Sequence, residues 1–384
     1  MDISRTKVVI ATHSLVYGAP QALREYLMLE NVKELLFISH PLQIDGSRST
    51  SETIIKGKSS KTQTSRLRTK TPILNYIIES VLTFRWVFNK KTTYDLYVGV
   101  DPLNCGIGVI LKKLGKVKKL VYYTIDYVPK RFLNRVLNNI YHHIDKLCVS
   151  NADETWNVSN RIAEGREKIR GLSRKTYNKQ KVVPIGVWID RVKRLPFGKI
   201  KKNQLLFVGN LLEKQGVQIV LDSIPDIVKK LPDFHFLVVG GGEYESTLKQ
   251  KVKMLKLEKH VTFTGWIKER EKLDTIMADS AVAIAMYDKK KDTFTYYADP
   301  TKLKDYLSAG LPVLLTEVPF NAHDLEKNNC GIIIRYDKQD ISKAVITILK
   351  DQETLKIYRQ NSVSYVSQFG WSKIFAEALK QFLQ

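Results

Sequence analysis

The sequence has little of several features that would narrow its function by themselves. It has only three cysteines in 384 residues, Cys105, Cys148 and Cys330, and their wide spacing fits neither a disulfide framework nor a zinc or redox motif. No run of 18 apolar residues occurs, so we expect no membrane-spanning helix. The first residues lead directly into an apolar strand and do not resemble a signal peptide. These absences predict a cytoplasmic protein with buried, reduced cysteines.

Acidic residues are also scarce relative to basic ones. The chain has 62 Lys and Arg against 39 Asp and Glu, a formal net charge of +23. Residues 1–198 carry 34 basic and 16 acidic residues, whereas residues 199–384 carry 28 and 23. This asymmetry indicates an anionic partner, either nucleic acid, an anionic membrane surface or an anionic substrate, unless it reflects a generally basic proteome. Nucleic acid is the least expected, because we find no RNA-binding motif and no interleaved basic and aromatic residues.

What the chain does have is a regular alternation of apolar strands and amphipathic helices. Six candidate strands mark the second half, at residues 205–209, 236–240, 261–265, 281–286, 313–316 and 331–335. This alternation predicts an α/β protein with parallel, doubly wound sheets. Because the length exceeds one ordinary core, we expect two domains. They are an acceptor-binding domain over 1–198, a nucleotide-binding domain over 199–370 after a basic linker, and a closing helix over 371–384.

Two segments of the first half each allow two structural interpretations. Residues 43–70 are polar and basic, and we expect an excursion that is either mobile or a small hairpin. Residues 72–88 form an apolar helix with basic flanks, which favours a core helix but also fits a membrane interface. Beyond it we predict a helix over 132–143 and a strand over 145–150. Asp126 directly follows a predicted strand, at the sheet edge where open parallel sheets bind ligands.

The stretch from Asp299 to Val313 reads as a short helix with both ends marked. Asp299 is a candidate cap, and Gly310 suits the left-handed residue just past the end. Lys302 and Asp305 lie three residues apart and share a face. A cation beside free backbone N–H groups makes an anion site, and a carboxylate one turn later suits a ribose diol. The alternative is a surface ion pair worth under about 1 kcal/mol.

Two glycine loops follow strands in the same predicted sheet. Gly209, Asn210 and Lys214 belong to the first loop, and Gly240 and Gly241 belong to the second. Such loops let backbone N–H groups approach a phosphate. Neither loop fits the GxxxxGK[ST] or GxGxxG pattern. Together with the stretch around Lys302, they predict a nucleotide site.

The order of these motifs resembles the nucleotide-sugar domain of GT-B glycosyltransferases, with the large retaining family 4 as the nearest group. The resemblance covers roughly residues 200–370 and implies two Rossmann-like domains facing a cleft. It implies that the C-terminal domain holds a nucleotide diphosphate sugar and that the N-terminal domain holds the acceptor. By position it assigns Asp305 to the ribose, Lys302 to the diphosphate, Gly265 to the base, and Asp126 to the reacting sugar. Thr301 is expected among the residues that bind the nucleotide.

The chain departs from the family pattern at several of these positions. Asn210 and Gln215 stand where the family has Arg and Lys, with Lys214 one place early. Of the family's paired glutamates, Asp305 replaces the second and Tyr297 stands at the first. These departures bear on the diphosphate contacts and on the stereochemical outcome.

The expected function is therefore sugar transfer from a nucleotide diphosphate sugar to a hydroxyl of a lipid-linked or polysaccharide acceptor. Lys214, Lys302 and the amide-rich loops would stabilise the leaving diphosphate, with no metal and no further cofactor. Asp126 would orient or deprotonate the acceptor. The basic first half predicts peripheral contact with an anionic membrane surface on its cytoplasmic face. Two other readings stay open: a nucleotide-sugar epimerase, and a catalytically inactive glycosyltransferase-like scaffold.

Overall fold

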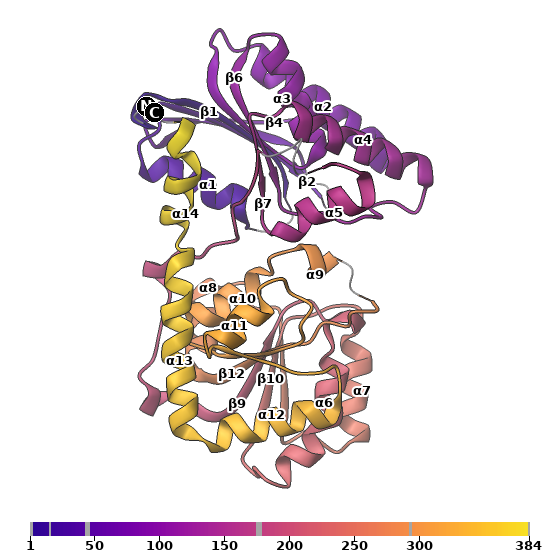
Figure 1. Ribbon diagram of the computed structural model, residues 1–384, viewed down its shortest axis with the longest axis vertical. Helices are drawn as coiled ribbons and strands as arrows, with labels where there is room; N and C mark the ends of the chain where they lie inside the picture. Colours follow the sequence, from indigo (N-terminus) through magenta and orange to yellow (C-terminus); the bar gives the residue numbers. More distant parts are fainter. Residues whose placement is uncertain (1–2, 15–16, 43–46, 174–178, 292–293, 383–384) are drawn as a thin grey trace. The chain divides into compact units, whose positions relative to one another are not determined.

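The computed structural model divides the chain into two compact units, which Figure 1 colours from indigo to yellow along the sequence. One unit is Met1–Ile185 with Trp371–Gln384, and the other is Gly186–Gly370. The residues described are 3–14, 17–42, 47–173, 179–291 and 294–382. Residues 43–46 of the expected excursion and Leu383 of the expected final helix lie outside them.

The first unit is built on a sheet of eight strands in the order β4-β3-β2-β1-β5-β6-β7-β8. The strands are β1 (Lys7–Ser14), β2 (Glu34–Pro41), β3 (Thr50–Ile55), β4 (Lys58–Thr64), β5 (Tyr94–Val100), β6 (Val117–Thr124), β7 (Glu154–Asn157) and β8 (Gln180–Val182). The hairpin β3–β4 pairs antiparallel with β2, and the other pairs are parallel. The hairpin reading of the polar excursion is thus confirmed for its described residues.

Helices cover both faces of this sheet. They are α1 (Ala19–Leu29), α2 (Pro72–Phe88), α3 (Pro102–Lys113), α4 (Arg135–Asn151), α5 (Asn160–Arg170) and α14 (Trp371–Leu379). Helices α2, α3 and α4 lie side by side (Figure 1) and close the core cluster around Tyr97, Cys105 and Cys148. The closing helix α14 returns to this unit and packs on α1, with the rings of Tyr26 and Phe375 5.8 Å apart.

The second unit has a fully parallel sheet of six strands in the order β11-β10-β9-β12-β13-β14. Its strands are β9 (Lys201–Val208), β10 (His235–Val239), β11 (Val261–Gly265), β12 (Ser280–Ala285), β13 (Val313–Leu315) and β14 (Gly331–Ile333). Its helices are α6 (Val217–Val228), α7 (Glu245–Met254), α8 (Arg270–Asp279), α9 (Phe294–Tyr297), α10 (Thr301–Ser308), α11 (Ala322–Lys327), α12 (Lys338–Lys350) and α13 (Gln352–Val366). Helices α6, α7 and α12 pack on one face, and α8, α10, α11 and α13 on the other. The predicted doubly wound α/β fold is confirmed.

Each sheet has one point at which the strand order reverses direction. In the first unit the chain builds β2 beside β1 and then continues on the other side with β5. In the second unit β10 and β11 extend from β9, and β12 then starts on its opposite side. Open α/β sheets bind ligands at the carboxyl ends of strands that flank such a reversal. We therefore expect one ligand site after β1 and β5, and another after β9 and β12.

Three expectations for the first half need correction. Residues 145–150 are not a strand but the end of α4, which Asn134 caps by accepting hydrogen bonds from two backbone N–H groups. Helix α2 is not mainly a core helix, because Leu82 and Val87 are its only fully buried apolar side chains. Residues 186–198 lie in the second unit, since the Val187 N–H donates to the Phe369 carbonyl. None of the described helices is long and apolar enough to cross a membrane.

Candidate functional site

Backbone hydrogen bonds join the glycine loops at the carboxyl edge of the second sheet. The Gly209 N–H donates to the Val239 carbonyl at 3.0 Å, and the Gly240 N–H donates to the Gly265 carbonyl at 3.0 Å. A Cβ on Gly240, whose φ is +128°, would lie 1.9 Å from the Gly209 carbonyl oxygen. Glycine is therefore required for this close crossing. These two N–H groups hold the loops to each other, so they do not supply the free donors that the sequence predicted.

Lys302 lies beside the first glycine loop, at the point where the strand order reverses. The Tyr306 hydroxyl accepts from the Val208 N–H at 2.6 Å, which fixes α10 against the end of β9. The Lys302 ammonium donates to Gln215 Oε1 at 2.7 Å and lies over the Phe207 ring at 4.6 Å and the Tyr287 ring at 5.5 Å. The structure thus places a single cation on aromatic faces at the predicted edge.

The contact between Lys302 and Gln215 accounts for one departure from the family pattern. A lysine at position 215 would bring a second ammonium to hydrogen-bond distance of Lys302 and would repel it. Glutamine at this position instead offers a neutral acceptor, which orients the remaining cation. The loss of the loop lysine is therefore compatible with a cationic site.

Asp305 and Asp299 have partners that the sequence did not predict. Asp305 pairs with Arg270 at 2.9 Å, and Arg270 also pairs with Asp274 at 2.8 Å. Burial raises the pKa of Asp305, and the Arg270 charge opposes this rise. Asp299 does not cap α10, because its carboxylate binds the buried ammonium of Lys304 at 3.0 Å. Gly310 is left-handed as expected, with φ +78°.

The other predicted residues of this unit surround Lys302 less closely. Lys214 is half-buried, and its ammonium lies 5.8 Å from the centre of the Phe294 ring. Asn210 and Thr301 are exposed, whereas Gly241 is buried. Trp266, which the sequence reading missed, follows Gly265 with its indole 61% exposed. Its Nε1 would lie 2.7 Å from a Cβ on Gly241, so the indole stands against the second glycine loop.

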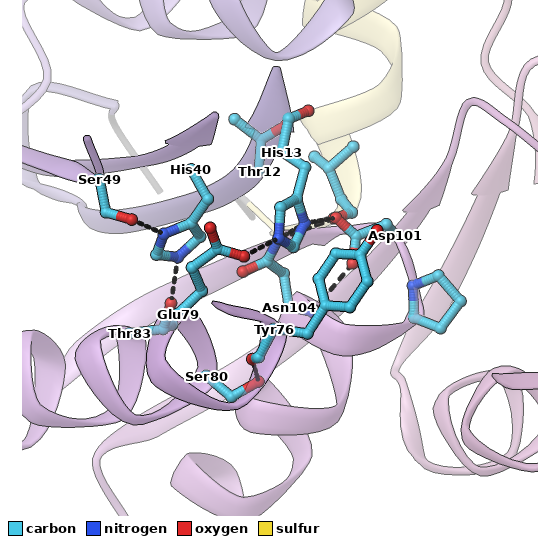
Figure 2. Close-up of polar contacts among 12 residues, drawn as sticks. Thr12, His13, His40, Ser49, Tyr76, Glu79, Ser80, Thr83, Asp101 and Asn104 are labelled. Atoms are coloured by element: carbon cyan, nitrogen blue, oxygen red, sulfur yellow. Dashed lines mark hydrogen bonds and ion pairs between the residues drawn. The ribbon is translucent and has the colours of Figure 1, made fainter. Parts of the chain in front are cut away.

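In the first unit, a cluster of buried side chains occupies the equivalent reversal point. His13 on β1 lies between Asp101, at 2.7 Å from Nδ1, and Glu79 on α2, at 3.0 Å from Nε2 (Figure 2). The Asn104 amide donates to Asp101 at 2.8 Å. His40 lies beside His13, with ring centroids 5.2 Å apart. We call His13, Glu79, Asp101 and Asn104 the histidine cluster.

The carboxylates of the histidine cluster determine the charge of its imidazole. Burial alone would lower the pKa of His13, but Asp101 and Glu79 outweigh burial and raise it to about 9. His40 responds in the opposite way, since burial and the neighbouring His13 charge lower its pKa to about 3. Its two nitrogens pair with the Ser49 and Thr83 hydroxyls (Figure 2). At neutral pH the cluster therefore holds an imidazolium beside a neutral histidine.

Asp101 has a backbone conformation that is rare for aspartate. Its φ is +76° and its ψ is 161°, a combination that almost only glycine adopts. The same carboxylate caps α3 by accepting from the Asn104 N–H at 3.0 Å. Such conformations concentrate at functional sites, where surrounding contacts compensate for the strain. We therefore regard Asp101 as part of a candidate site and not only of the core.

Asp126 follows β6, next to the strand that carries Asp101. Its side chain is exposed. The surrounding protein nevertheless raises the pKa of Asp126, with Arg131 opposing and Asp101 reinforcing the rise. Since β1, β5 and β6 are neighbours in the sheet, His13, Asp101 and Asp126 occupy three adjacent strand ends. No group of acidic, histidine or cysteine side chains in the described ranges has the arrangement that a metal ion needs.

A protein-family match falls within the second unit of this chain. Residues 193–364 match the family described as glycosyl transferases group 1. Spore coat protein SA of Bacillus subtilis is 24% identical over 232 residues, which are 56% of this chain and 59% of that protein. A phosphatidyl-myo-inositol mannosyltransferase of Mycobacterium tuberculosis is 22% identical over 207 residues, 52% of each chain. The matches thus span only about half to three-fifths of these relatives.

Solved structures match along nearly the whole chain. A sucrose-phosphate synthase from Thermosynechococcus elongatus superposes with a TM-score of 0.73 at 14% identity and covers 98% of both chains. The Anabaena protein HepE in complex with UDP-glucose has a TM-score of 0.71 at 16% identity, covering 98% of this chain and all of that one. At such low identity these likenesses show the fold, which is that of the GT-B glycosyltransferases.

Proposed function

Since this chain belongs to the glycosyl transferases group 1 family through residues 193–364, we propose that it transfers a sugar from a nucleotide diphosphate sugar to a hydroxyl group of a lipid-linked or polysaccharide acceptor. The observation that carries the proposal is the Lys302 ammonium, held by Gln215 at the reversal point of the second sheet. A cation in that place stabilises the charge that grows on a leaving diphosphate.

The proposed reaction exchanges one bond at the anomeric carbon for another. The bond from this carbon to the diphosphate oxygen breaks, and the nucleoside diphosphate leaves with the electron pair. A bond to the acceptor oxygen forms, and the acceptor proton passes to a base, for which we propose Asp126. The raised pKa of Asp126 suits a group that takes up a proton.

The donor would lie along the carboxyl edge of the second sheet. We propose that Lys302, Lys214 and Thr301 contact the diphosphate, that Asp305 accepts the ribose hydroxyls, and that Gly209, Asn210, Gly240, Gly241 and Gly265 border the nucleotide. Trp266 adds an exposed ring for base stacking, which the sequence alone did not provide. The ion pair from Arg270 keeps Asp305 oriented, and a ribose would share that carboxylate.

We propose three further features of the reaction. The resemblance to a retaining family supports retention of configuration at the anomeric carbon, which NMR of the product would test. The lysines at the donor site support a reaction without a metal, tested by activity in the presence of EDTA. The basic first unit supports binding to the cytoplasmic face of an anionic membrane, which added salt would weaken. Absence of binding to anionic vesicles at low salt would refute the last point.

The transfer itself is tested by nucleotide release. Purified protein would be incubated with UDP-, GDP-, ADP- and dTDP-sugars, with and without a membrane lipid extract. We expect one nucleoside diphosphate to be released only when extract is present, and the release to be lost in Lys302→Ala. Conversion of the donor without extract would indicate an epimerase. Binding of nucleotide without release from any donor would indicate an inactive scaffold.

A further inference from the structure

A deep apolar groove opens on the surface of the first unit between α2, α3 and α4. It has a volume of about 560 Å³, within the range of about 300–1,000 Å³ usual for ligand pockets. Its walls include Ile73, Ile77 and Val81 from α2, Ile107 and Ile110 from α3, and Ile140 from α4. Figure 1 shows these three helices side by side.

The groove offers an occupant almost nothing to hydrogen-bond. Among the residues that the structure describes, no charged side chain lines it, and the polar lining residues are Tyr76, Ser80 and Tyr141. The Ser80 hydroxyl already donates to the Tyr76 carbonyl at 2.8 Å. An extended peptide or a sugar would leave its own polar groups unpaired there, at a cost of about 1–3 kcal/mol for each group. A hydrocarbon chain has no such groups and fits this chemistry.

Several groove side chains are exposed to an unusual degree for their type. Ile77 is 56% exposed, Val81 59% and Ile140 51%. A contiguous apolar surface of this kind marks a binding site more often than a chance exposure. It also explains why α2 is not mainly a core helix: Ile77 and Val81 line the groove, whereas Val87 is buried in the core.

The groove adjoins the histidine cluster. On α2, Glu79 belongs to the cluster and the next residue, Ser80, lines the groove. On α3, Asn104 belongs to the cluster and Leu103 lines the groove. The Tyr76 ring forms the partition, since it lines the groove and meets the His13 ring edge-on at 5.8 Å (Figure 2). An amphiphile in the groove would therefore place its polar end beside the candidate acceptor site.

A positive charge lies at this polar end, since Arg131 directly precedes Phe132, which lines the groove. Burial raises the pKa of Tyr76 and of Tyr141, and the Arg131 charge opposes the rise at both hydroxyls. Arg131 acts in the same way on Asp126. Arg131 is exposed and follows the exposed Lys130. These cations complement an anionic head group, such as a phosphate, on a hydrocarbon chain.

We propose that the α2–α3–α4 groove binds the hydrocarbon chain of an anionic lipid acceptor, with the acceptor's head group at Arg131 and the histidine cluster. This inference rests on the proposed glycosyl transfer and narrows its acceptor to a lipid-linked one. The groove is then a substrate subsite that selects acceptors by their chain.

Direct binding of a monomeric amphiphile tests the groove. Dodecyl phosphate would be titrated into the full chain below the concentration at which it forms micelles, beside inorganic phosphate and uncharged dodecyl maltoside. The variant is Ile77→Gln with Ile140→Gln, and the matched control is Leu29→Gln on α1, where Leu29 is 58% exposed. All three substituted residues are exposed, so the variants are expected to fold.

We expect the wild type and the control to bind dodecyl phosphate equally, and the double variant to bind it about tenfold more weakly. We expect no comparable binding of inorganic phosphate, and weaker binding of the maltoside. Arg131→Ala is expected to weaken binding of dodecyl phosphate but not of the maltoside. Equal binding of dodecyl phosphate by the double variant and the wild type would overturn the proposal.

Two other outcomes would also overturn it. If the wild type binds anionic phosphatidylglycerol vesicles through these residues but not the monomeric probe, the groove face inserts into a membrane surface and does not hold a chain. If it binds no probe and forms a dimer that the double variant cannot form, the groove is covered by a second copy of the chain.

The same samples separate this inference from the proposed function. Thermal stabilisation by nucleotide reports on the second unit, and the double variant is expected to keep it while losing extract-dependent nucleotide release. A double variant with undiminished release would remove the groove from the acceptor site. A wild type that binds dodecyl phosphate but neither binds nor turns over any nucleotide sugar would refute glycosyl transfer instead.

Discussion

The two units have the same kind of sheet, but the candidate site of one consists mainly of backbone loops and that of the other consists of paired side chains. In the second unit, backbone loops rich in glycine cross each other and one lysine supplies the charge. In the first unit, buried side chains from β1, α2 and α3 pair with each other. The crossing of the loops is made by backbone groups, so it does not depend on side chains such as Asn210 and Gln215. A buried charged cluster does depend on its side chains, because each member neutralises another.

The largest effect is expected from a substitution that removes the imidazolium of the histidine cluster. His13→Asn leaves the Asp101 and Glu79 carboxylates buried without their cation, which we expect to lower the free energy of unfolding by about 3–5 kcal/mol. Urea denaturation would measure the loss. His143→Asn, at an exposed position on α4, is the matched control and is expected to change little. An unchanged midpoint for His13→Asn would show that the first unit does not depend on this charge pair.

The second-largest effect is expected in the second unit, where a substitution should change the rate of nucleotide release and not the stability of the protein. Lys302→Ala removes the cation from the glycine-loop site, and we expect nucleotide release to slow by about 10²–10³-fold. The urea midpoint is expected to stay near that of the wild type, because Lys302 is only half-buried. Lys253→Ala, exposed on α7, is the control for loss of one charge. Release at the wild-type rate in Lys302→Ala would contradict the donor site as we describe it.

The difference between the two candidate sites also determines how much of each could be predicted from the sequence. The second unit could be predicted because each glycine loop and the stretch around Lys302 is a short local pattern at the end of a strand or the start of a helix, and all six strands were found. The histidine cluster joins residues 13, 79, 101 and 104, and only the order of strands brings them together. The one local signal was Asp101-Pro102 at a strand-to-helix turn. The charge pairing of Asp305 with Arg270 escaped prediction for the same reason, since 35 residues separate them.

A third prediction concerns pH. Folding raises the pKa of His13 from 6.5 to about 9, so the folded protein holds this proton more tightly than the unfolded chain. The stabilisation is complete below about pH 6.5 and is lost as the pH rises through about 9, a change of about 3 kcal/mol. Unfolding free energies measured from pH 6.5 to 10 would show the decline. His13→Asn is expected to abolish it, and an identical decline in that variant would assign it to other groups.

The smallest effect is expected at Trp266 in the second unit, and it tests where the nucleotide base binds. Trp266→Ala removes the exposed ring beside the second glycine loop, and we expect nucleotide binding to weaken by about tenfold through lost base stacking. Trp266→Phe is expected to keep most of the affinity. Met254→Ala, at a residue that is 74% exposed on α7, controls for loss of an exposed apolar side chain. If Trp266→Ala binds as tightly as the wild type, the base lies elsewhere on the sheet edge.

The most direct test of the central claim is a calorimetric titration of nucleoside diphosphates into the wild type, Lys302→Ala and Asp126→Asn. The claim is that the second unit holds the donor and the first unit acts on the acceptor. It predicts that Lys302→Ala loses nucleotide binding, whereas Asp126→Asn binds like the wild type but no longer transfers the sugar. Nucleotide binding that survives in Lys302→Ala, or that disappears in Asp126→Asn, would contradict this division of roles.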